Sequence, residues 1–172
     1  MQLISEKLAQ LGEEVHVFTA RAVHMSHFRA PDASVQGLPQ KEIINGVHVQ
    51  RFKVNYRIMD FVLQRNINVR GVYRLFRVLT GKTFELWEHG PVTLGMLGAI
   101  RQLKPDILLV TNHYFLTTYF GYLAKRFLKI PLILMPIIHS AERWIRLPFL
   151  KVLYDSSDVL IACTEFEKRY LV

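Results

Sequence analysis

Three short apolar stretches decide the fold of this chain. Residues 106–112 read DILLVTN, residues 132–138 read LILMPII and residues 158–164 read DVLIACT. Such nearly continuous aliphatic runs are typical of strands that are buried on both faces of a parallel sheet. The segments between them have the length and pattern of helices, which indicates repeated βαβ units. We therefore expect an α/β domain with a Rossmann-like, doubly wound and mostly parallel sheet.

The N-terminal part of the chain adds a helix, a strand and a hairpin. Residues 2–11 have helical spacing and end before Gly12, a residue suited to a helix C-cap. Residues 15–20 read VHVFTA and are predicted as a strand, whereas residues 21–42 show no period and are predicted as a long loop. Asn45-Gly46 lies between two apolar segments. Because both residues tolerate positive φ, they predict a tight β-hairpin.

Four further helices are expected, in residues 66–79, 91–103, 117–128 and 166–171. Pro91 opens the second of these, at a first-turn position where proline is tolerated. The helix 66–79 has two distinct faces at intervals of three and four residues. Its apolar stripe is Val69, Val72, Leu75, Phe76 and Leu79, and its other side carries Arg70, Arg74 and Arg77.

The composition indicates one folded domain in a reducing compartment. A length of 172 residues suits one domain, and a hydrophobic content of 51% excludes a disordered or low-complexity chain. The one cysteine, Cys163, excludes a disulfide framework and a cysteine-rich zinc site. Because Cys163 falls within a predicted buried strand, we expect an unreactive thiol. His24 and His27 lack further ligands at zinc spacing, so no metal site is expected.

No part of the sequence has the pattern of a membrane span or a signal peptide. The longest apolar run, residues 130–138, is broken by two prolines and is far shorter than the roughly 20 residues that a spanning helix needs. The first residues lack the basic, apolar and small-residue regions of a signal peptide. We expect a cytoplasmic protein.

Positive charge is concentrated in one part of the chain. The sequence carries a net charge of +8, and residues 51–80 hold seven Arg and Lys side chains against one Asp. Such a field attracts anionic lipid headgroups, phosphorylated ligands or nucleic acid. Arg70, Arg74 and Arg77 form either a solvated face of a core-packed helix or a contact with an anionic membrane. Trp144 lies in a second apolar and basic segment, which could face a membrane, an acceptor or a missing lobe.

Polar residues follow the predicted strands. In parallel α/β sheets, ligands bind beyond the carboxyl ends of the strands, which singles out residues 19–21, 111–113, 139–140 and 164–165. Asn112 and His113 could hydrogen-bond a ligand hydroxyl, or they could be ordinary polar loop residues that cap the following helix. For Thr164 a plain helix N-cap is the favoured interpretation. His139 could likewise bind a ligand, or it could serve only to cap the end of its strand.

Five segments, in order along nearly the whole chain, carry a resemblance to a known family. They are residues 8–19 (LAQLGEEVHVFT), 44–51 (INGVHVQR), 104–113 (KPDILLVTNH), 131–139 (PLILMPIIH) and 158–168 (DVLIACTEFEK). With these segments the chain resembles the N-terminal lobe of a GT-B fold glycosyltransferase, of the retaining glycosyltransferase family 4 (group 1) type.

The resemblance implies the acceptor-binding lobe of an enzyme that transfers a sugar from a nucleotide-sugar to a glycan or lipid-linked acceptor, with retention of anomeric configuration. It implies a catalytic role for His139 beside the donor sugar, where hydrogen bonding and charge stabilisation depend on placement. It also implies acceptor binding by Asn112, His113, Thr164 and Glu165. A second lobe would hold the nucleotide-sugar, so this lobe is expected to bind no cofactor and no metal by itself.

The sequence departs from the family's pattern at both ends. Family members begin with an additional strand and a glycine-rich turn before the first helix, and they continue into a second lobe that grips the nucleotide-sugar. We therefore expect residues 1–172 to be a single N-terminal lobe, truncated at both ends, that lacks the family's first strand. Such a lobe would be inactive without its partner, the C-terminal lobe.

The alternative function class is a non-catalytic basic domain that binds an anionic membrane lipid or nucleic acid. The basic and aromatic alternation of residues 51–57 (RFKVNYR) could stack on and neutralise a nucleic-acid backbone. The predicted order of helices and strands matches no usual nucleic-acid-binding module, which makes nucleic acid the less favoured partner. A membrane contact would place the protein peripherally, on the inner face of the membrane.

Overall fold

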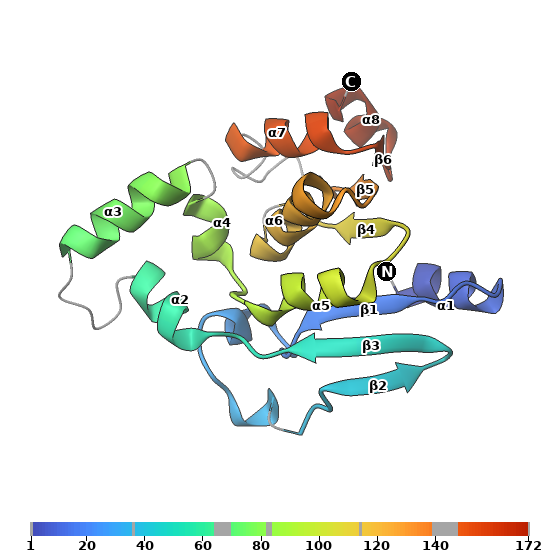
Figure 1. Ribbon diagram of the computed structural model, residues 1–172, viewed down its shortest axis with the longest axis horizontal. Helices are drawn as coiled ribbons and strands as arrows, with labels where there is room; N and C mark the ends of the chain where they lie inside the picture. Colours follow the sequence, from blue (N-terminus) through green and yellow to red (C-terminus); the bar gives the residue numbers. More distant parts are fainter. Residues whose placement is uncertain are drawn as a thin grey trace.

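The computed structural model describes residues 2–35, 37–63, 70–81, 84–113, 115–138 and 148–171. These residues form an α/β fold with two small sheets and helices around them (Figure 1). One sheet has the order β1-β3-β2, from β1 (His16–Ala20), β2 (Lys41–Ile44) and β3 (Val47–Phe52). The other has the order β4-β5-β6, from β4 (Leu108–Thr111), β5 (Leu132–Met135) and β6 (Val159–Leu160).

The strands are mostly parallel, as the apolar runs predict. β1 pairs parallel with β3, and β4, β5 and β6 are all parallel to their neighbours. The exception is the hairpin of β2 and β3, which is antiparallel. Its turn is confirmed at Asn45 and Gly46, whose φ values of 50° and 83° are those that a two-residue hairpin turn needs.

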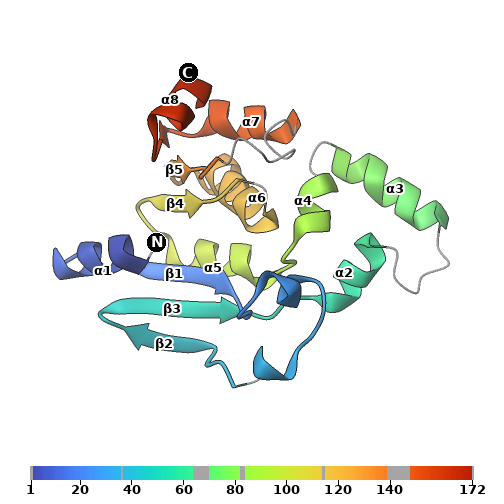
Figure 2. The same ribbon diagram turned by 180° about the vertical axis from the view of Figure 1, so that it is seen from behind.

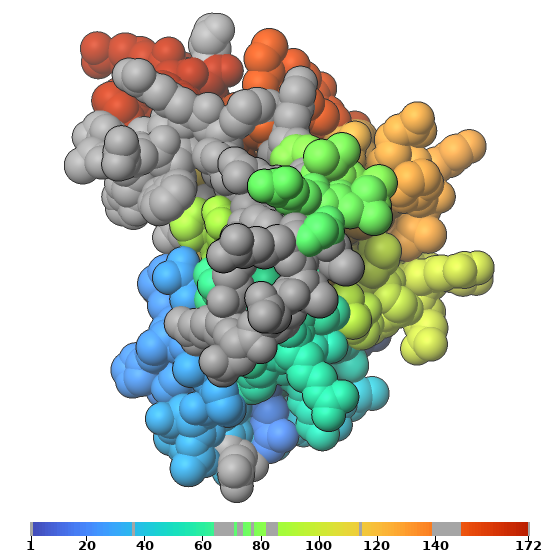
Figure 3. Space-filling model, turned by 90° about the vertical axis from the view of Figure 1, so that its left-hand side faces the viewer, coloured from blue at the N-terminus to red at the C-terminus, as the bar shows by residue number. Residues whose placement is uncertain are grey.

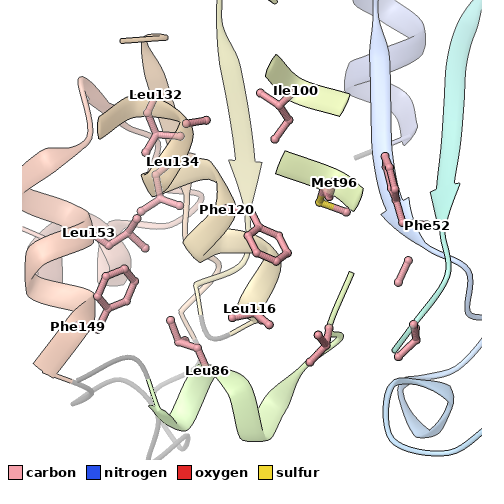
Figure 4. Close-up of a cluster of buried hydrophobic side chains, with 14 of the residues drawn as sticks. Phe52, Leu86, Met96, Ile100, Leu116, Phe120, Leu132, Leu134, Phe149 and Leu153 are labelled. Atoms are coloured by element: carbon pink, nitrogen blue, oxygen red, sulfur yellow. The ribbon is translucent and has the colours of Figure 1, made fainter. Parts of the chain in front are cut away.

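The two sheets are not joined by hydrogen bonds into one. Among the described residues, β1 is paired with β3 alone and β4 with β5 alone, so the strands form two separate sheets. A shared hydrophobic core connects the two sheets instead. In Figure 4, Met96 and Ile100 lie between Phe52, which ends β3, and Phe120, which packs beside β4 and β5.

The described helices are α1 (Gln2–Gln10), α2 (Tyr56–Val62), α3 (Arg70–Thr80), α4 (Phe84–His89), α5 (Gly95–Leu103), α6 (Leu116–Leu123), α7 (Pro148–Ser156) and α8 (Glu165–Leu171). Five of the helices, α1, α3, α5, α6 and α8, occur near the predicted ranges with shifted ends, whereas α2, α4 and α7 were not predicted. A π-helical turn, Ala124–Leu128, continues α6. The predicted loop 21–42 contains two short 3-10 turns, Met25–Phe28 and Ala33–Val35, and the start of β2.

The prediction that Pro91 opens a helix is wrong, because α5 begins at Gly95. The residues before it are used for packing. Val92 and Thr93 are fully buried, and the carbonyl of Val92 accepts a hydrogen bond from the backbone N–H of Asn55, 2.8 Å away. Because this carbonyl is bonded to a neighbouring segment, it does not accept a hydrogen bond within the first turn of a helix.

The predicted strands 132–138 and 158–164 are shorter than expected. β5 ends at Met135, and two residues later Ile137 has a φ of 53°, which is incompatible with a strand. β6 ends at Leu160, and shortly beyond it the amides of Cys163 and Thr164 donate to the Glu167 side chain instead of continuing a strand. Cys163 is exposed, so the prediction that it lies in a buried strand is wrong.

The parallel strands end on one side of the molecule. In Figure 1 the arrows of β1, β3 and β4 point toward the side that carries α2, α3 and α4. Figure 2, from behind, shows the same arrangement, with α1 at the opposite end from α3. The side that carries the carboxyl ends is therefore the place to look for a ligand site.

Candidate functional site

The chain leaves β4 through Asn112, whose φ of 71° lies in the left-handed region. Its backbone N–H donates to the carbonyl of Met135 at 3.0 Å, which holds the end of β4 against the end of β5. Its carbonyl accepts a bond from the Thr118 hydroxyl at 3.4 Å, in the first turns of α6. Asparagine adopts this conformation more easily than most residues. The turn after β4 is thus set by the backbone of Asn112, and its side chain is partly exposed.

His113 is fully buried behind this turn. Its Nδ1 lies 2.6 Å from the carbonyl oxygen of Pro136, just after β5. A carbonyl oxygen only accepts, so Nδ1 carries the proton and donates it. The ring therefore links the ends of β4 and β5, as does the backbone of Asn112. Direct contact of His113 with an acceptor stays a prediction.

The chain leaves β5 through an unusual backbone conformation. Ile137 has a φ of 53°, and for a β-branched residue this conformation costs about 1–2 kcal/mol. Such conformations persist where the surroundings fix them, and they cluster at functional sites. The Ile138 side chain that follows is buried. His139 and Trp144, predicted as the catalytic residue and a membrane contact, lie outside the described residues.

The turn after β6 carries Thr164 and Glu165, both exposed. The Thr164 hydroxyl accepts a hydrogen bond from the backbone N–H of Glu167 at 3.1 Å, so its predicted role as the N-cap of the last helix is confirmed. In turn, the Glu167 carboxylate accepts a hydrogen bond from the N–H of Thr164 at 3.0 Å, which completes a capping box. Acceptor binding by Thr164 and Glu165 stays a prediction.

Sequence reasoning missed a group of contacts beside the end of β4. The rings of Phe28 and Phe115 meet edge to face, with 5.4 Å between their centroids. The carbonyl of Gly90 accepts a bond from the N–H of Leu116 at 2.8 Å. These contacts bring the loops after β1 and β4 to the segment that follows α4. The available signal was the position of the loop 21–42 directly after a parallel strand, which places it at the ligand-binding edge.

Two histidines in this region are partly or fully buried. Burial lowers the pKa of His89, and the nearby positive charge of Arg29 lowers it further. His27 accepts hydrogen bonds at Nδ1 from the backbone N–H groups of Val23 and His24, at 3.2 and 3.4 Å. Its ring thus serves the local 3-10 turn. Within the described ranges, no three His, Cys, Asp or Glu side chains are grouped so as to hold a metal ion.

The α3 helix presents apolar side chains to solvent. Leu75, Val78 and Leu79 are 57%, 76% and 75% exposed, so the predicted apolar stripe does not pack into the core as one face. Phe76 points the other way, and its ring meets those of Phe61 and Trp87 edge to face at 5.4 and 5.3 Å.

Arg74 is exposed on the same helix. The side chains of the other two predicted contacts, Arg70 and Arg77, lie outside the described part. In Figure 1, α3 lies at the edge of the molecule toward which the parallel strands point, and its green atoms are at the surface of that side in Figure 3. No helix in the described part of the chain combines the length and the apolar character needed to cross a membrane.

Comparison with known proteins identifies the family. No curated protein matches the chain. The family described as "Glycosyl transferase 4-like domain" matches residues 1–172. The α/β architecture with parallel strands fits a Rossmann-like lobe of such a protein. Because the match extends over the full length of the sequence, the chain belongs to the glycosyl transferase 4-like domain family.

Proposed function

We propose that this domain is the acceptor-binding lobe of a retaining glycosyltransferase that uses a nucleotide-sugar donor and a glycan or lipid-linked acceptor. The observation that carries the proposal is the family match over residues 1–172. The geometry supports it, since the polar residues Asn112, Thr164 and Glu165 all follow strands of one parallel sheet, β4-β5-β6. Ligands bind at that edge in folds of this class.

The proposed roles follow from the chemistry of these groups. The amide of Asn112, the hydroxyl of Thr164 and the carboxylate of Glu165 are hydrogen-bonding groups that suit the hydroxyls of a sugar. His139, the next residue after the buried Ile138, is proposed to stabilise charge at the anomeric centre, which requires an exact position. A second lobe holds the nucleotide-sugar, and this domain is inactive alone.

The first experiment tests the two-lobe arrangement. The gene is sequenced on both sides of this coding region, and we expect a second α/β lobe to be encoded downstream. In-frame stop codons on both sides would contradict the enzyme proposal and favour a binding domain. The protein with both lobes is then incubated with membranes of its source cells and radiolabelled UDP-glucose, UDP-N-acetylglucosamine or GDP-mannose.

We expect one of these sugars to enter a membrane-extractable product, and NMR of its anomeric proton to show the configuration of the donor. The variant His139→Ala should lose at least 100-fold in kcat. A matched His16→Ala variant, on β1, should keep the rate, because that ring bonds to the exposed Glu14 and stacks on His48. An unchanged rate in His139→Ala would contradict the role of His139.

We further propose that α3 docks on an anionic membrane, where the acceptor of the reaction would lie. The observation that favours this is the exposure of Leu75, Val78 and Leu79 on a helix that also bears Arg74. A helix with apolar and arginine faces lies in the interface of an anionic bilayer, with its apolar side inserted and its cations at the headgroups. Oligonucleotide binding in place of lipid binding would support the alternative function instead.

A further inference from the structure

Glu167 is a buried carboxylate in a helix that is otherwise mostly exposed. Its side chain is 3% exposed, and both carboxylate oxygens accept hydrogen bonds from the backbone. Oε1 accepts from the N–H of Ile138 at 2.7 Å, and Oε2 accepts from the N–H groups of Cys163 and Thr164 at 2.5 and 3.0 Å. The three donors come from the segments that follow β5 and β6.

The capping box accounts for only part of this arrangement. A capping box needs only one carboxylate oxygen, which accepts a hydrogen bond from the N–H of the N-cap residue, here Thr164. The second oxygen reaches Ile138, 29 residues earlier in the chain. Glu167 therefore does more than begin α8: it joins the turn after β6 to the turn after β5.

This junction lies where the sheet itself no longer holds the two strands together. The ladder of β5 and β6 ends at the pair Leu134 and Leu160, followed by one bond from the N–H of Ile161 to the carbonyl of Leu134 at 2.9 Å. Beyond that bond, the carboxylate of Glu167 is what connects the described ends of the two segments. Hydrogen bonds to an ionised group are stronger than those between neutral groups, which suits this task.

The left-handed backbone of Ile137 gives the junction a specific purpose. A β-branched residue with a φ of 53° is under strain and relaxes unless its neighbours hold it. The N–H of the next residue, Ile138, is bound by Glu167, and the Ile138 side chain is buried. The direction in which the chain leaves β5 is thereby fixed.

We propose that Glu167 is a positioning residue of the acceptor site. By holding Ile138 against the turn that carries Thr164 and Glu165, it fixes the end of the segment after β5 relative to that turn. This inference rests on the proposed glycosyl transfer, and it adds a residue whose own side chain does not touch the substrate. Its effect is on the geometry of the site.

The hydrogen bonds are tested first, without reference to sugar chemistry. Glu167→Gln keeps the size of the side chain but leaves one oxygen that can accept hydrogen bonds. The NH2 group that replaces the other oxygen cannot accept from a backbone N–H. Hydrogen exchange of the 172-residue chain, followed by NMR, should be at least 10-fold faster at Ile138 or at Cys163 in this variant. The amide of Val49, in β3, should keep its rate, which separates local opening from global unfolding. Unchanged exchange at Ile138, Cys163 and Thr164 would overturn the inference.

Two control variants make the exchange result specific. Glu13→Gln makes the same chemical change at an exposed position and should leave the three amides as they are. Thr164→Val removes the hydroxyl that caps α8 while the bond from Ile138 to Glu167 remains, so exchange should rise at Glu167 and not at Ile138. Faster exchange at Ile138 in Thr164→Val would show that Glu167 only caps α8, and it would contradict the inference.

The positioning role is tested in the protein with both lobes. Glu167→Gln should lower kcat at least 10-fold and leave the KM for the nucleotide-sugar within twofold, because the donor is held elsewhere. Faster exchange with an unchanged kcat would overturn the positioning role and leave the proposed function standing. A wild-type enzyme that transfers no sugar would overturn the proposed function and the positioning role together, whatever the exchange rates show about the hydrogen bonds.

Discussion

The backbone N–H of Asn112 donates a hydrogen bond to the carbonyl oxygen of Met135, with 3.0 Å between the two atoms. This bond extends the pairing of β4 and β5 beyond the last residues of the ladder, Thr111 and Met135. Directly after this bond the backbone turns away from the strand, at the left-handed conformation of Asn112, with a φ of 71°. The place where β4 ends and the candidate site begins is thus decided by one residue's backbone.

Substitution of Asn112 separates this backbone role from acceptor binding. Asn112→Val should lower the free energy of unfolding by about 1–2 kcal/mol, because a β-branched residue is strained at positive φ. Asn112→Gly should keep the stability within about 0.5 kcal/mol, because glycine adopts this conformation freely. Urea unfolding followed by circular dichroism measures both values. Equal stability of the valine and glycine variants would contradict the backbone role.

Gly121 lies where α6 packs closely on the sheet. A Cβ atom at this position would lie 2.5 Å from Cγ2 of Val110 in β4, and Gly121 is buried. We expect Gly121→Ala to lower the free energy of unfolding by about 1–3 kcal/mol, as overpacking in a core does.

Gly98 provides the matched control, in α5, where a Cβ would meet nothing within 4 Å. Gly98→Ala should raise the stability by about 0.5–1 kcal/mol, because alanine favours a helix. Thermal unfolding of the two variants should therefore shift the midpoint in opposite directions. A shift of Gly121→Ala to higher temperature would show that α6 does not pack on β4 as closely as described.

Asp158 gives the fold an acid-sensitive link. Its Oδ2 lies 2.5 Å from Nζ of Lys125 and accepts a bond from the N–H of Leu132 at 2.7 Å. The hydrogen bond from Lys125, followed by the one from Leu132, holds the pKa of the Asp158 carboxyl below its ordinary value. Stabilisation by this group is therefore complete above about pH 4 and is lost as the pH falls through the lowered pKa.

Two variants test the link. In Asp158→Asn the stability difference from the wild type should be constant above about pH 4 and should shrink as the pH falls further. In Lys125→Met the pKa of Asp158 should rise toward its ordinary value, which carbon NMR of the carboxyl measures directly. A stability difference for Asp158→Asn that grows in acid would contradict the assignment.

The proposed membrane contact predicts salt-dependent binding to vesicles. The chain should sediment with vesicles of phosphatidylglycerol and phosphatidylcholine at low salt and be released as salt increases. Leu75→Gln with Leu79→Gln should lower the bound fraction at least fivefold. Arg74→Gln should lower the affinity about fivefold, since one cation at an anionic surface contributes about 1 kcal/mol.

The matched control is Leu3→Gln, on α1, where the leucine is 81% exposed at the opposite end of the molecule from α3. This variant should bind vesicles as the wild type does. An equal loss in Leu3→Gln would show a general hydrophobic attraction instead of docking through α3. Failure of the wild-type chain to sediment at any salt concentration would contradict the membrane contact.

The sequence is sufficient to predict the elements whose pattern is local. The hairpin follows from Asn45 and Gly46, the parallel strands follow from their apolar runs, and the cap at Thr164 follows from its place before a helix. Each of these depends on residues within a few positions of one another. The family resemblance rests on the same strands and turns, and the family match confirms it.

Features that depend on distant partners could not be predicted in this way. The link between the turns after β5 and β6 depends on Glu167, whose bond to Ile138 joins positions 29 residues apart. The late start of α5 depends on Asn55, whose backbone N–H donates a hydrogen bond to the carbonyl of Val92. The exposure of Leu79 depends on which face of α3 meets Phe61 and Trp87, and a helical period shows two faces without showing which one packs.

The acceptor site at the ends of β4 and β6 is tested most directly by NMR titration. The isotope-labelled chain is titrated with lipid-linked and free oligosaccharides extracted from membranes of its source cells, and separately with UDP-glucose and GDP-mannose. The oligosaccharides should shift the amide signals of Asn112, Thr164 and Glu165 and leave those of Ile44 and Val49 in the hairpin unchanged, and the nucleotide-sugars should shift none. Signal changes confined to the hairpin, or binding of the nucleotide-sugars alone, would contradict an acceptor-binding lobe.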